Sequence, residues 1–462
     1  MQFKSIEHKV KIWFEKLKQY AKLGFDQINN AKLKYNILHA IPFWAGAFVC
    51  GIIAVFYAKL FDFVEIFREH LFSLNPYILF ALSPIAFIAA WWVVKKWAPY
   101  SKGSGIPQVT AAIELNNHKH KDLVDKLLGL RVAIVKMLSS LLLLLGGGFI
   151  GREGPTIQIS ASIFKKINDI LPEWYPKISR SNMIITGAAA GLAAAFNTPL
   201  GGIVFAIEEL TKTHFNYFKS ALLTGVIIAG ITALGILGPY LYIGDPKISQ
   251  YSFSIVMPVI ALAIITGLLG SIMGKMIISL SNFRKQHLNK WQNIVFLIVS
   301  GLVIACFAYF INSDVLGSGK KMMVESLFTD DKTIHWYYPF IRIIGSVISF
   351  SSGAAGGIFA PSLSTGAGLG AVFSQFLDLT TGEANLLILC GMTGFLTAIT
   401  RSPFTACILV IEMTNSHIVI FYIMFTALIS NITAVSVSSK SFYDTLKHQY
   451  INDLHQNNKT NK

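Results

Sequence analysis

Long apolar runs separated by short polar or basic stretches recur along the chain from His39 to Val437. A helix that crosses a membrane needs about 20 mostly apolar residues. Runs near this length occupy approximately residues 39–60, 76–95, 130–150, 183–207, 218–243, 253–280, 293–312, 335–351, 384–411 and 417–437. The pattern predicts an all-α polytopic membrane protein.

Glycine or proline interrupts several of these runs, and two shorter apolar stretches, near 155–171 and 357–376, begin in glycine-rich turns. Inside a bilayer, non-helical backbone survives only where protein or a water-filled cavity surrounds it. We therefore expect broken helices whose breaks lie inside the protein, near a permeation or binding site.

Composition supports a membrane protein. Of the 462 residues, 53% are hydrophobic and only 14% are charged, against roughly 25% charged in an average globular protein. The net charge of +15 is typical of nucleic-acid binding in a soluble protein, but here the basic residues cluster at the termini and in loops. The positive-inside rule and anionic lipid headgroups account for them, so we expect a lipid bilayer and no nucleic acid as partner.

The first 36 residues hold eight lysines against three acidic residues. An apolar stripe at helical spacing comprises Phe3, Ile6, Val10, Trp13, Leu17 and Tyr20. Residues 1–36 thus predict a cytoplasmic amphipathic helix at the membrane interface, with a soluble helix packed on the protein's own loops as the alternative. The tail is basic as well, so we expect both termini in the cytoplasm and an even number of crossings.

Two regions of the chain resemble each other. A stretch beginning at Gly187 aligns with one beginning at Gly391, an offset of 204 residues that also aligns two prolines and two glutamates, Glu208 with Glu412. Apolar segments match by chance, but aligned prolines and glutamates favour an internal duplication. We expect two inverted-topology membrane repeats over 37–245 and 246–446, with broken helices whose N-termini meet near the midplane, followed by a short cytoplasmic tail over 447–462.

Three pentapeptides share one form: Gly103-Ser104-Gly105-Ile106-Pro107, Gly151-Arg152-Glu153-Gly154-Pro155 and Gly357-Ile358-Phe359-Ala360-Pro361. In each, glycine permits an unusual turn and proline suits the first turn of a helix. Each therefore predicts a helix N-terminus, whose free N–H groups and positive dipole end attract anions without a full charge. That suits a permeating anion, which must bind and then leave.

With these motifs the sequence resembles the CLC family of chloride channels and proton-coupled chloride transporters, whose filter motifs are GSGIP, GREGP and GxFxP. The resemblance covers roughly residues 40–446 and includes the Glu208-Glu209 pair and Tyr443. It implies a homodimer of inverted-repeat subunits, each with its own anion pathway.

The resemblance also implies an anion site formed by four residues. The hydroxyls of Ser104 and Tyr443 and the backbone N–H groups of Ile358 and Phe359 would bind a central anion. The alternatives are a simple helix cap for Ser104 and an interfacial belt position for Tyr443.

Two glutamates are candidate proton-coupling gates. Glu153 is an intramembrane carboxylate, a functional candidate by default; ionised, it can take an anion's place at helix N-termini. Its alternative is a structural salt bridge with Arg152. Glu209, the second of the pair, matches the residue that hands protons between cytoplasm and interior in transporters of the family. Its alternative is a solvated pair with Glu208 at a helix end.

The chain departs from the family pattern in places. It has Gln108 and Thr110 where glutamates often follow the first motif, Ala355 in place of a proline, and Lys320 where a tyrosine is frequent. It ends soon after Tyr443, which leaves no room for paired CBS domains and favours a prokaryotic type in the cell (inner) membrane.

Three functions remain open. The first is a proton-coupled chloride antiporter with chloride and protons as substrates. The second is a passive, voltage- or pH-gated chloride channel that works without Glu209. The third, an intramembrane enzyme, lacks any HExxH, GxSxG or clustered His/Cys/Asp motif. We expect no enzyme activity, no cofactor and no metal; the four cysteines, Cys50, Cys306, Cys390 and Cys407, lie in apolar runs as packing residues.

Overall fold

The computed structural model describes residues 30–116, 121–211, 219–248, 252–329, 332 and 334–460, together with residues 19, 25 and 26. The interfacial helix expected over residues 1–36 lies mostly outside these residues and stays a prediction. The first long helix begins at Ala31, after Asn30, whose side chain accepts a hydrogen bond from the Leu33 N–H at 3.0 Å.

Almost all regular structure in the described part of the chain is helical. The first half contains α2 (Ala31–Leu74), α3 (Ile78–Trp97), η1 (Pro99–Ser101), α4 (Ile106–Glu114), α5 (Lys121–Leu127), α6 (Leu130–Leu145), α7 (Glu153–Asp169), α8 (Arg180–Phe196), α9 (Pro199–Phe205), the π-helix η3 (Ala206–Leu210) and α10 (Lys219–Leu237). The second half contains η5 (Phe253–Ile255), α11 (Val256–His287), α12 (Lys290–Phe310), η6 (Ser313–Val315), α13 (Lys320–Phe328), α14 (Tyr338–Ser351), α15 (Phe359–Ser374), α16 (Thr381–Thr400), α17 (Pro403–Thr414), η7 (His417–Val419), α18 (Ile420–Val437) and α19 (Phe442–Thr460).

Eight helices within the described ranges are long and apolar enough to cross a membrane, by length and composition. The predicted all-α, multi-span class is confirmed. Two predicted runs are broken as expected: α8 ends before Asn197 and α9 begins at Pro199, while α16 ends before Arg401 and α17 begins at Pro403. Asn197 and Arg401 both adopt the left-handed conformation, with φ of 57° and 63°, which ends each helix.

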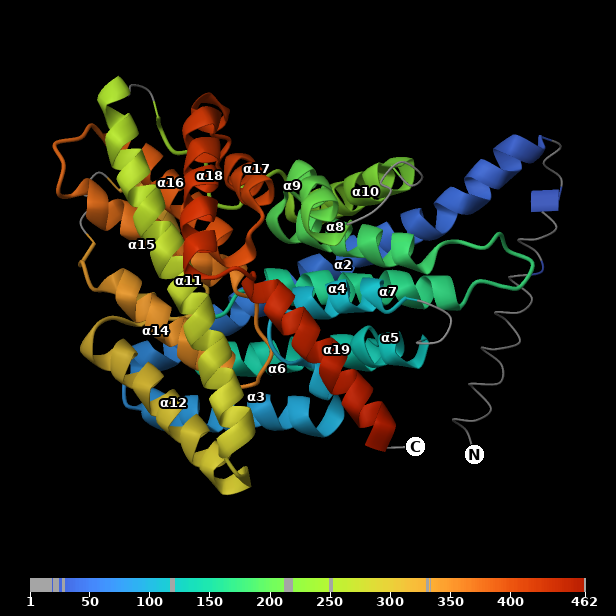
Figure 1. Ribbon diagram of the computed structural model, residues 1–462, viewed down its shortest axis with the longest axis horizontal. Coiled ribbons are helices and arrows are strands. Elements are labelled where there is room, and N and C mark those ends of the chain that lie inside the picture. The colour runs from blue at the N-terminus through green and yellow to red at the C-terminus, as the bar shows by residue number, and fades with distance from the viewer. Residues whose placement is uncertain are drawn as a thin grey trace.

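The two halves repeat the same packing. In the first half α7 packs on α8 and α2 on α10; in the second half α15 packs on α16 and α11 on α18. Figure 1 shows most of the first half, blue to green, beside most of the second half, yellow to red, with α19 running across the front of the first-half helices. Short helices α9 and α17 join the halves by packing on each other.

Reciprocal carboxylate caps fix this junction. The Glu208 carboxylate accepts hydrogen bonds from the N–H groups of Phe404 (3.2 Å) and Thr405 (2.7 Å), at the start of α17. The Glu412 carboxylate does the same for Leu200 (3.0 Å) and Gly201 (2.6 Å), at the start of α9. The equivalent residues are 204 positions apart in the sequence: Glu208 and Glu412, Leu200 and Phe404, and Gly201 and Thr405. The aligned glutamates that indicated a duplication thus cap each other's half, as an inverted repeat requires.

Burial separates the central helices from the peripheral ones. Of the apolar window in α16, 94% is buried, whereas the value is 33% for α10, α12 and α18. The exposed apolar faces of those outer helices can contact lipid or another subunit, because apolar side chains in either place are not exposed to water. Helices α7, α8, α15 and α16 form the interior, so the glycine-rich motifs that begin α7 and α15 lie inside the protein.

Removal of one cap tests this reciprocity. Glu412→Ala leaves the N–H groups of Leu200 and Gly201 without their carboxylate, and bonds of this charge-assisted kind contribute about 1.5–3 kcal/mol each. We expect a lower unfolding temperature in detergent, and a similar fall for Glu208→Ala. Glu173→Ala, which removes an exposed carboxylate, is the matched control. Equal melting curves for all three variants would show that the caps do not stabilise the junction.

Candidate functional site

Backbone hydrogen bonds join the three glycine-rich motifs. The Gly103 N–H donates to the Ala354 carbonyl (2.8 Å), and the Gly356 N–H donates to the Gly103 carbonyl (3.1 Å). Gly151 and Gly357 exchange two bonds, each of 2.8 Å. The breaks, far apart in sequence, therefore meet at one place, and each satisfies polar backbone groups of another break.

Each motif begins a helix, as predicted. Helix α4 begins at Ile106, after Gly105 with φ of 115°, α7 begins at Glu153, and α15 begins at Phe359. The N–H groups at the start of a helix have no partner within it. Ile358, the N-cap of α15, and Phe359, its first residue, carry such groups. The site thus combines N–H donors with the positive ends of helix dipoles.

Two buried hydroxyls face each other at this meeting point. Ser104 and Tyr443 are each only 1% exposed, and each is the other's facing side chain. Neither hydroxyl meets strict hydrogen-bond geometry with another described residue, although the two are close enough for one to donate to the other. Because each hydroxyl has one proton to donate, both could turn toward a small anion placed between them. Structurally, Ser104 is no ordinary helix cap, since its side chain caps no N–H of α4.

The Glu153 side chain is fully buried at the start of α7. Its carboxylate lies next to the backbone N–H groups of Glu153 itself and Ala360, at the N-termini of α7 and α15. Oxygen Oε1 accepts a hydrogen bond from the Tyr242 hydroxyl at 3.2 Å, whereas Oε2 has no partner in the described part of the chain. The carboxylate occupies the kind of position in which an anion binds.

Arg152, the neighbour of Glu153, makes its ion pair elsewhere. Its guanidinium donates to the Asp62 carboxylate at 2.8 Å and to the Ala58 carbonyl at 2.9 Å, both on α2. The alternative of a structural Arg152–Glu153 salt bridge therefore has no support in the geometry. The Glu153 carboxylate is therefore not held in an ion pair with its neighbour.

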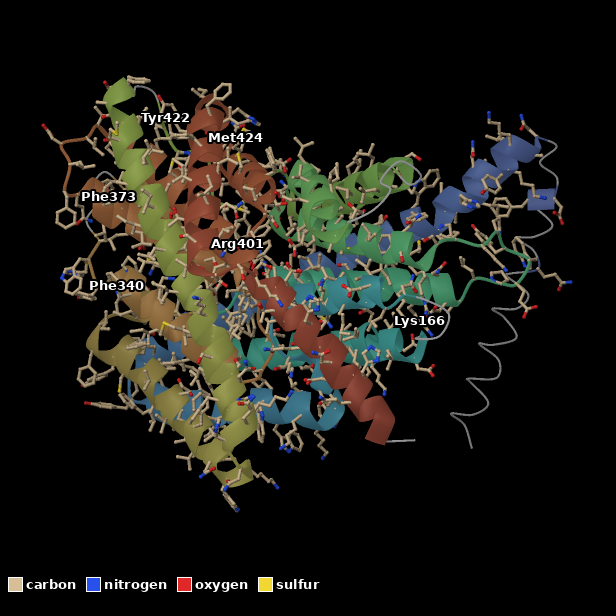
Figure 2. The ribbon with its side chains drawn as sticks, viewed as in Figure 1. Lys166, Phe340, Phe373, Arg401, Tyr422 and Met424 are labelled. Carbon is tan, nitrogen blue, oxygen red and sulfur yellow. The ribbon has the colours of Figure 1, made fainter. Side chains whose placement is uncertain are left out.

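A second region of the site is a cavity of about 590 Å³ that reaches Tyr443 from one side of the protein. Its lining includes Glu209, Arg401, Tyr443 and Lys447. Arg401, labelled in Figure 2, donates to the Ser438 carbonyl at 2.9 Å. Glu209 is half-buried and accepts a hydrogen bond from the Ser402 hydroxyl at 2.7 Å.

The adjacent glutamates have different environments. Both glutamates line the cavity, but the Glu208 carboxylate accepts hydrogen bonds from the N–H groups of Phe404 and Thr405 in α17, whereas Glu209 accepts one from the Ser402 hydroxyl. Tyr443 lies within electrostatic range of both Glu209 and Glu153. Both candidate gates therefore lie near Tyr443.

Sequence reasoning missed two residues of the site. Lys136 is fully buried and donates to the Gly103 carbonyl at 2.8 Å, which holds the turn before Ser104. A lone lysine within the apolar run 130–150 was a usable signal, since intramembrane charges are rare. Tyr242, which contacts Glu153, gave no signal, because it lies at the end of the apolar run 218–243 and far in sequence from the three glycine-rich motifs.

Gln108 also has a structural role. It stands where glutamates are frequent in the resembled family, and its amide donates to the carbonyls of Tyr100 (3.1 Å) and Lys102 (2.6 Å). A neutral amide can donate these bonds and a carboxylate cannot. Gln108 therefore stabilises the backbone around the first motif with hydrogen bonds that a glutamate could not donate.

The fold and this arrangement define a multi-span membrane protein with a buried, anion-attracting path between helix N-termini. A family model described as "Voltage gated chloride channel" matches residues 85–435, well over half of the chain. The chain belongs to this family, which confirms the resemblance that the motifs indicated.

Curated relatives and solved structures agree with this family. An "H(+)/Cl(-) exchange transporter ClcA" from Salmonella schwarzengrund (strain CVM19633) is 29% identical over 445 residues, 91% of each chain. The structure of a "slow cyanobacterial Cl-/H+ antiporter" matches with a TM-score of 0.78 and 23% identity, over 90% of this chain and 98% of that one. A "CLC-type fluoride/proton antiporter" matches with a TM-score of 0.74 and 20% identity, over 90% and 98% of the two chains. At these identities the structures show a shared fold.

Close approach of the motifs makes a direct prediction. A methyl group at Gly154 would meet the Ser104 hydroxyl, the Ser104 carbonyl at 2.9 Å and the Gly357 Cα at 3.3 Å. Because backbone cannot yield cheaply, Gly154→Ala should destabilise the protein by about 1–3 kcal/mol, measured by thermal unfolding in detergent. Gly230→Ala, where nothing lies within 4 Å, is the matched control and should be neutral or stabilising. Equal stability of the two variants would contradict this packing.

Proposed function

We propose that the protein is a proton-coupled chloride antiporter, a secondary transporter and not an enzyme. One observation carries the proposal: the buried Glu153 carboxylate lies at the N-termini of α7 and α15, close to the buried hydroxyls of Ser104 and Tyr443. A titratable group in an anion's position makes anion passage depend on a proton. The printed names of the curated relatives support the same activity.

The coupling follows from charge. Ionised Glu153 competes with chloride for N–H donors and dipoles, because both are anions. Protonated Glu153 has lost the charge that favours this position, so chloride can take its place. Chloride is then bound by the hydroxyls of Ser104 and Tyr443 and the N–H groups of Ile358 and Phe359. Each cycle of displacement and return moves a proton one way and chloride the other.

Glu209 supplies the inner end of the proton path in this proposal. Its carboxylate faces the cavity and is held by the Ser402 hydroxyl at 2.7 Å. A carboxylate in contact with water can exchange protons with solvent and pass them inward. Glu208 is unsuited to this role, since its carboxylate binds backbone N–H groups of α17.

The proposal includes the setting of the protein. We place it in the cell (inner) membrane with both termini in the cytoplasm and the Glu209 cavity facing that side, where basic residues concentrate. We also propose a homodimer, because the short helices α9 and α17 carry exposed Leu200 (54%) and Phe404 (53%) that a second copy would cover. Chloride and protons are the ligands of the cycle, with no metal or cofactor.

A passive chloride channel is the second candidate, and the printed description of the family names one. The same anion site serves a channel equally well. The position of Glu209 in the inner cavity favours the antiporter, because a channel does not need a carboxylate there for protons.

Glu153→Gln removes the titratable gate while keeping its size. We expect chloride flux in proteoliposomes to continue with little dependence on pH, whereas proton movement stops, because glutamine cannot be ionised. Glu69→Gln, which neutralises a carboxylate paired with Arg68 at 3.4 Å, is the control and should keep both fluxes. Uphill proton movement by Glu153→Gln on a chloride gradient would disprove the assigned role.

Glu209→Gln separates the antiporter from the channel. Proton coupling should disappear while chloride binding, measured by calorimetry, changes little, because the four anion-binding residues remain. Glu208→Gln is the matched control, and it should retain coupling with some loss of stability. If wild type and Glu209→Gln both move chloride without protons, the channel is correct; if Glu209→Gln remains coupled, another route carries the proton.

A further inference from the structure

The segment that connects the two halves, between α10 and α11, reaches Glu153 through Tyr242. Its described residues are 238–248 and 252–255, and the first of these stretches is anchored to both halves. The Asn197 side chain donates to the Tyr240 carbonyl at 2.6 Å, and the Ile243 N–H donates to the Met413 carbonyl at 3.3 Å. Tyr242 lies between these anchors, so its backbone is fixed relative to both halves.

Tyr242 points its hydroxyl at the gate. The side chain is 3% exposed, and the hydroxyl donates to Oε1 of Glu153 at 3.2 Å. The ring packs edge-on against Phe196, with centroids 4.9 Å apart and planes at 85°. Backbone anchors and ring packing therefore hold the donor in place. The other groups acting on the Glu153 carboxylate are the Arg152 charge and the backbone N–H groups of Glu153 and Ala360, so Tyr242 gives it its side-chain hydrogen bond.

Charges around Tyr242 strengthen this donor. Lys320 Nζ lies 4.7 Å from the ring centroid, and Arg152 Cζ lies 5.9 Å from it. Asp62 and Glu65 of α2 also act on the tyrosine, but Asp62 is paired with Arg152 and Glu65 accepts bonds from Ser318. Cations against the ring face favour a phenol that donates to an anion. Lys320, which stands where a tyrosine is frequent in the family, thus places a positive charge against the Tyr242 ring.

We propose that Tyr242 is a positioning residue that latches the ionised Glu153 carboxylate at the outer end of the anion path. The proposal rests on the proposed function, in which chloride and this carboxylate compete for one place. The latch adds a donor that is available to the carboxylate in its seated position. It therefore stabilises the state in which chloride is excluded and lowers the apparent chloride affinity.

Competition gives the size of the effect. When a site must first release a competitor, the apparent affinity falls by the fraction of protein that is competent to bind. A hydrogen bond to a charged group contributes enough to change such an equilibrium roughly tenfold. Removal of the hydroxyl should thus tighten chloride binding by roughly that factor at any pH at which the carboxylate is ionised.

A double-mutant cycle tests the latch. Chloride affinity is measured by calorimetry on the purified full chain for wild type, Tyr242→Phe, Glu153→Gln and the double variant. Tyr242→Phe keeps the ring and its packing, so the fold should persist, as its melting temperature will show. We expect roughly tenfold tighter binding for Tyr242→Phe, and no further tightening when the same change is made in the Glu153→Gln background. Tyr240→Phe, in the same segment, is the matched control, because its hydroxyl makes no hydrogen bond to the described residues, and its affinity should stay at the wild-type value.

The outcomes separate the two proposals. Unchanged or weaker chloride binding in Tyr242→Phe would overturn the latch, and so would equal tightening with and without the Glu153 carboxylate, since a purely structural tyrosine acts in both backgrounds. Unchanged chloride affinity in Glu153→Gln alone would instead overturn the competition on which the proposed function rests.

Discussion

Backbone polar groups inside a membrane must find partners within the protein, and this requirement organises the centre of the molecule. Three helices begin there at glycine-rich breaks, and each break exposes N–H and C=O groups that a continuous helix would satisfy. Gly151 and Gly357 bond to each other, and Gly103 bonds to Ala354 and Gly356, just before the third motif. Breaks from both halves of the chain thus satisfy one another's backbone groups.

This arrangement leaves N–H groups at the helix starts, and those groups determine the chemistry of the site. Glu153 fills one such place with its own carboxylate, while Ser104 and Tyr443 present two buried hydroxyls close to each other. Partial charges attract an anion without trapping it, and a titratable competitor links the anion to protons. Carboxylates also bond helix N-termini at the junction of the halves, where Glu208 and Glu412 accept hydrogen bonds from N–H groups at the starts of α17 and α9.

The sequence predicted the elements whose physics is local. Helix starts at Ile106, Glu153 and Phe359 follow from glycine and proline spacing, and the breaks before Pro199 and Pro403 follow from proline chemistry. The sequence did not predict contacts between distant segments, because these depend on how the halves pack. Such contacts include the caps made by Glu208 and Glu412, the hydrogen bond from Lys136 to Gly103 and the hydrogen bond from Tyr242 to Glu153. The roles of the gates and anion ligands stay predictions until fluxes are measured.

Coupled exchange is the central claim, and one flux measurement tests it most directly. Wild-type protein is reconstituted in proteoliposomes with a chloride gradient and no initial pH difference, and external pH is recorded as chloride moves. The account predicts proton movement against its own gradient, opposite in direction to chloride and dependent on the protein. Chloride movement with no proton flux, once the membrane potential is clamped, would contradict it.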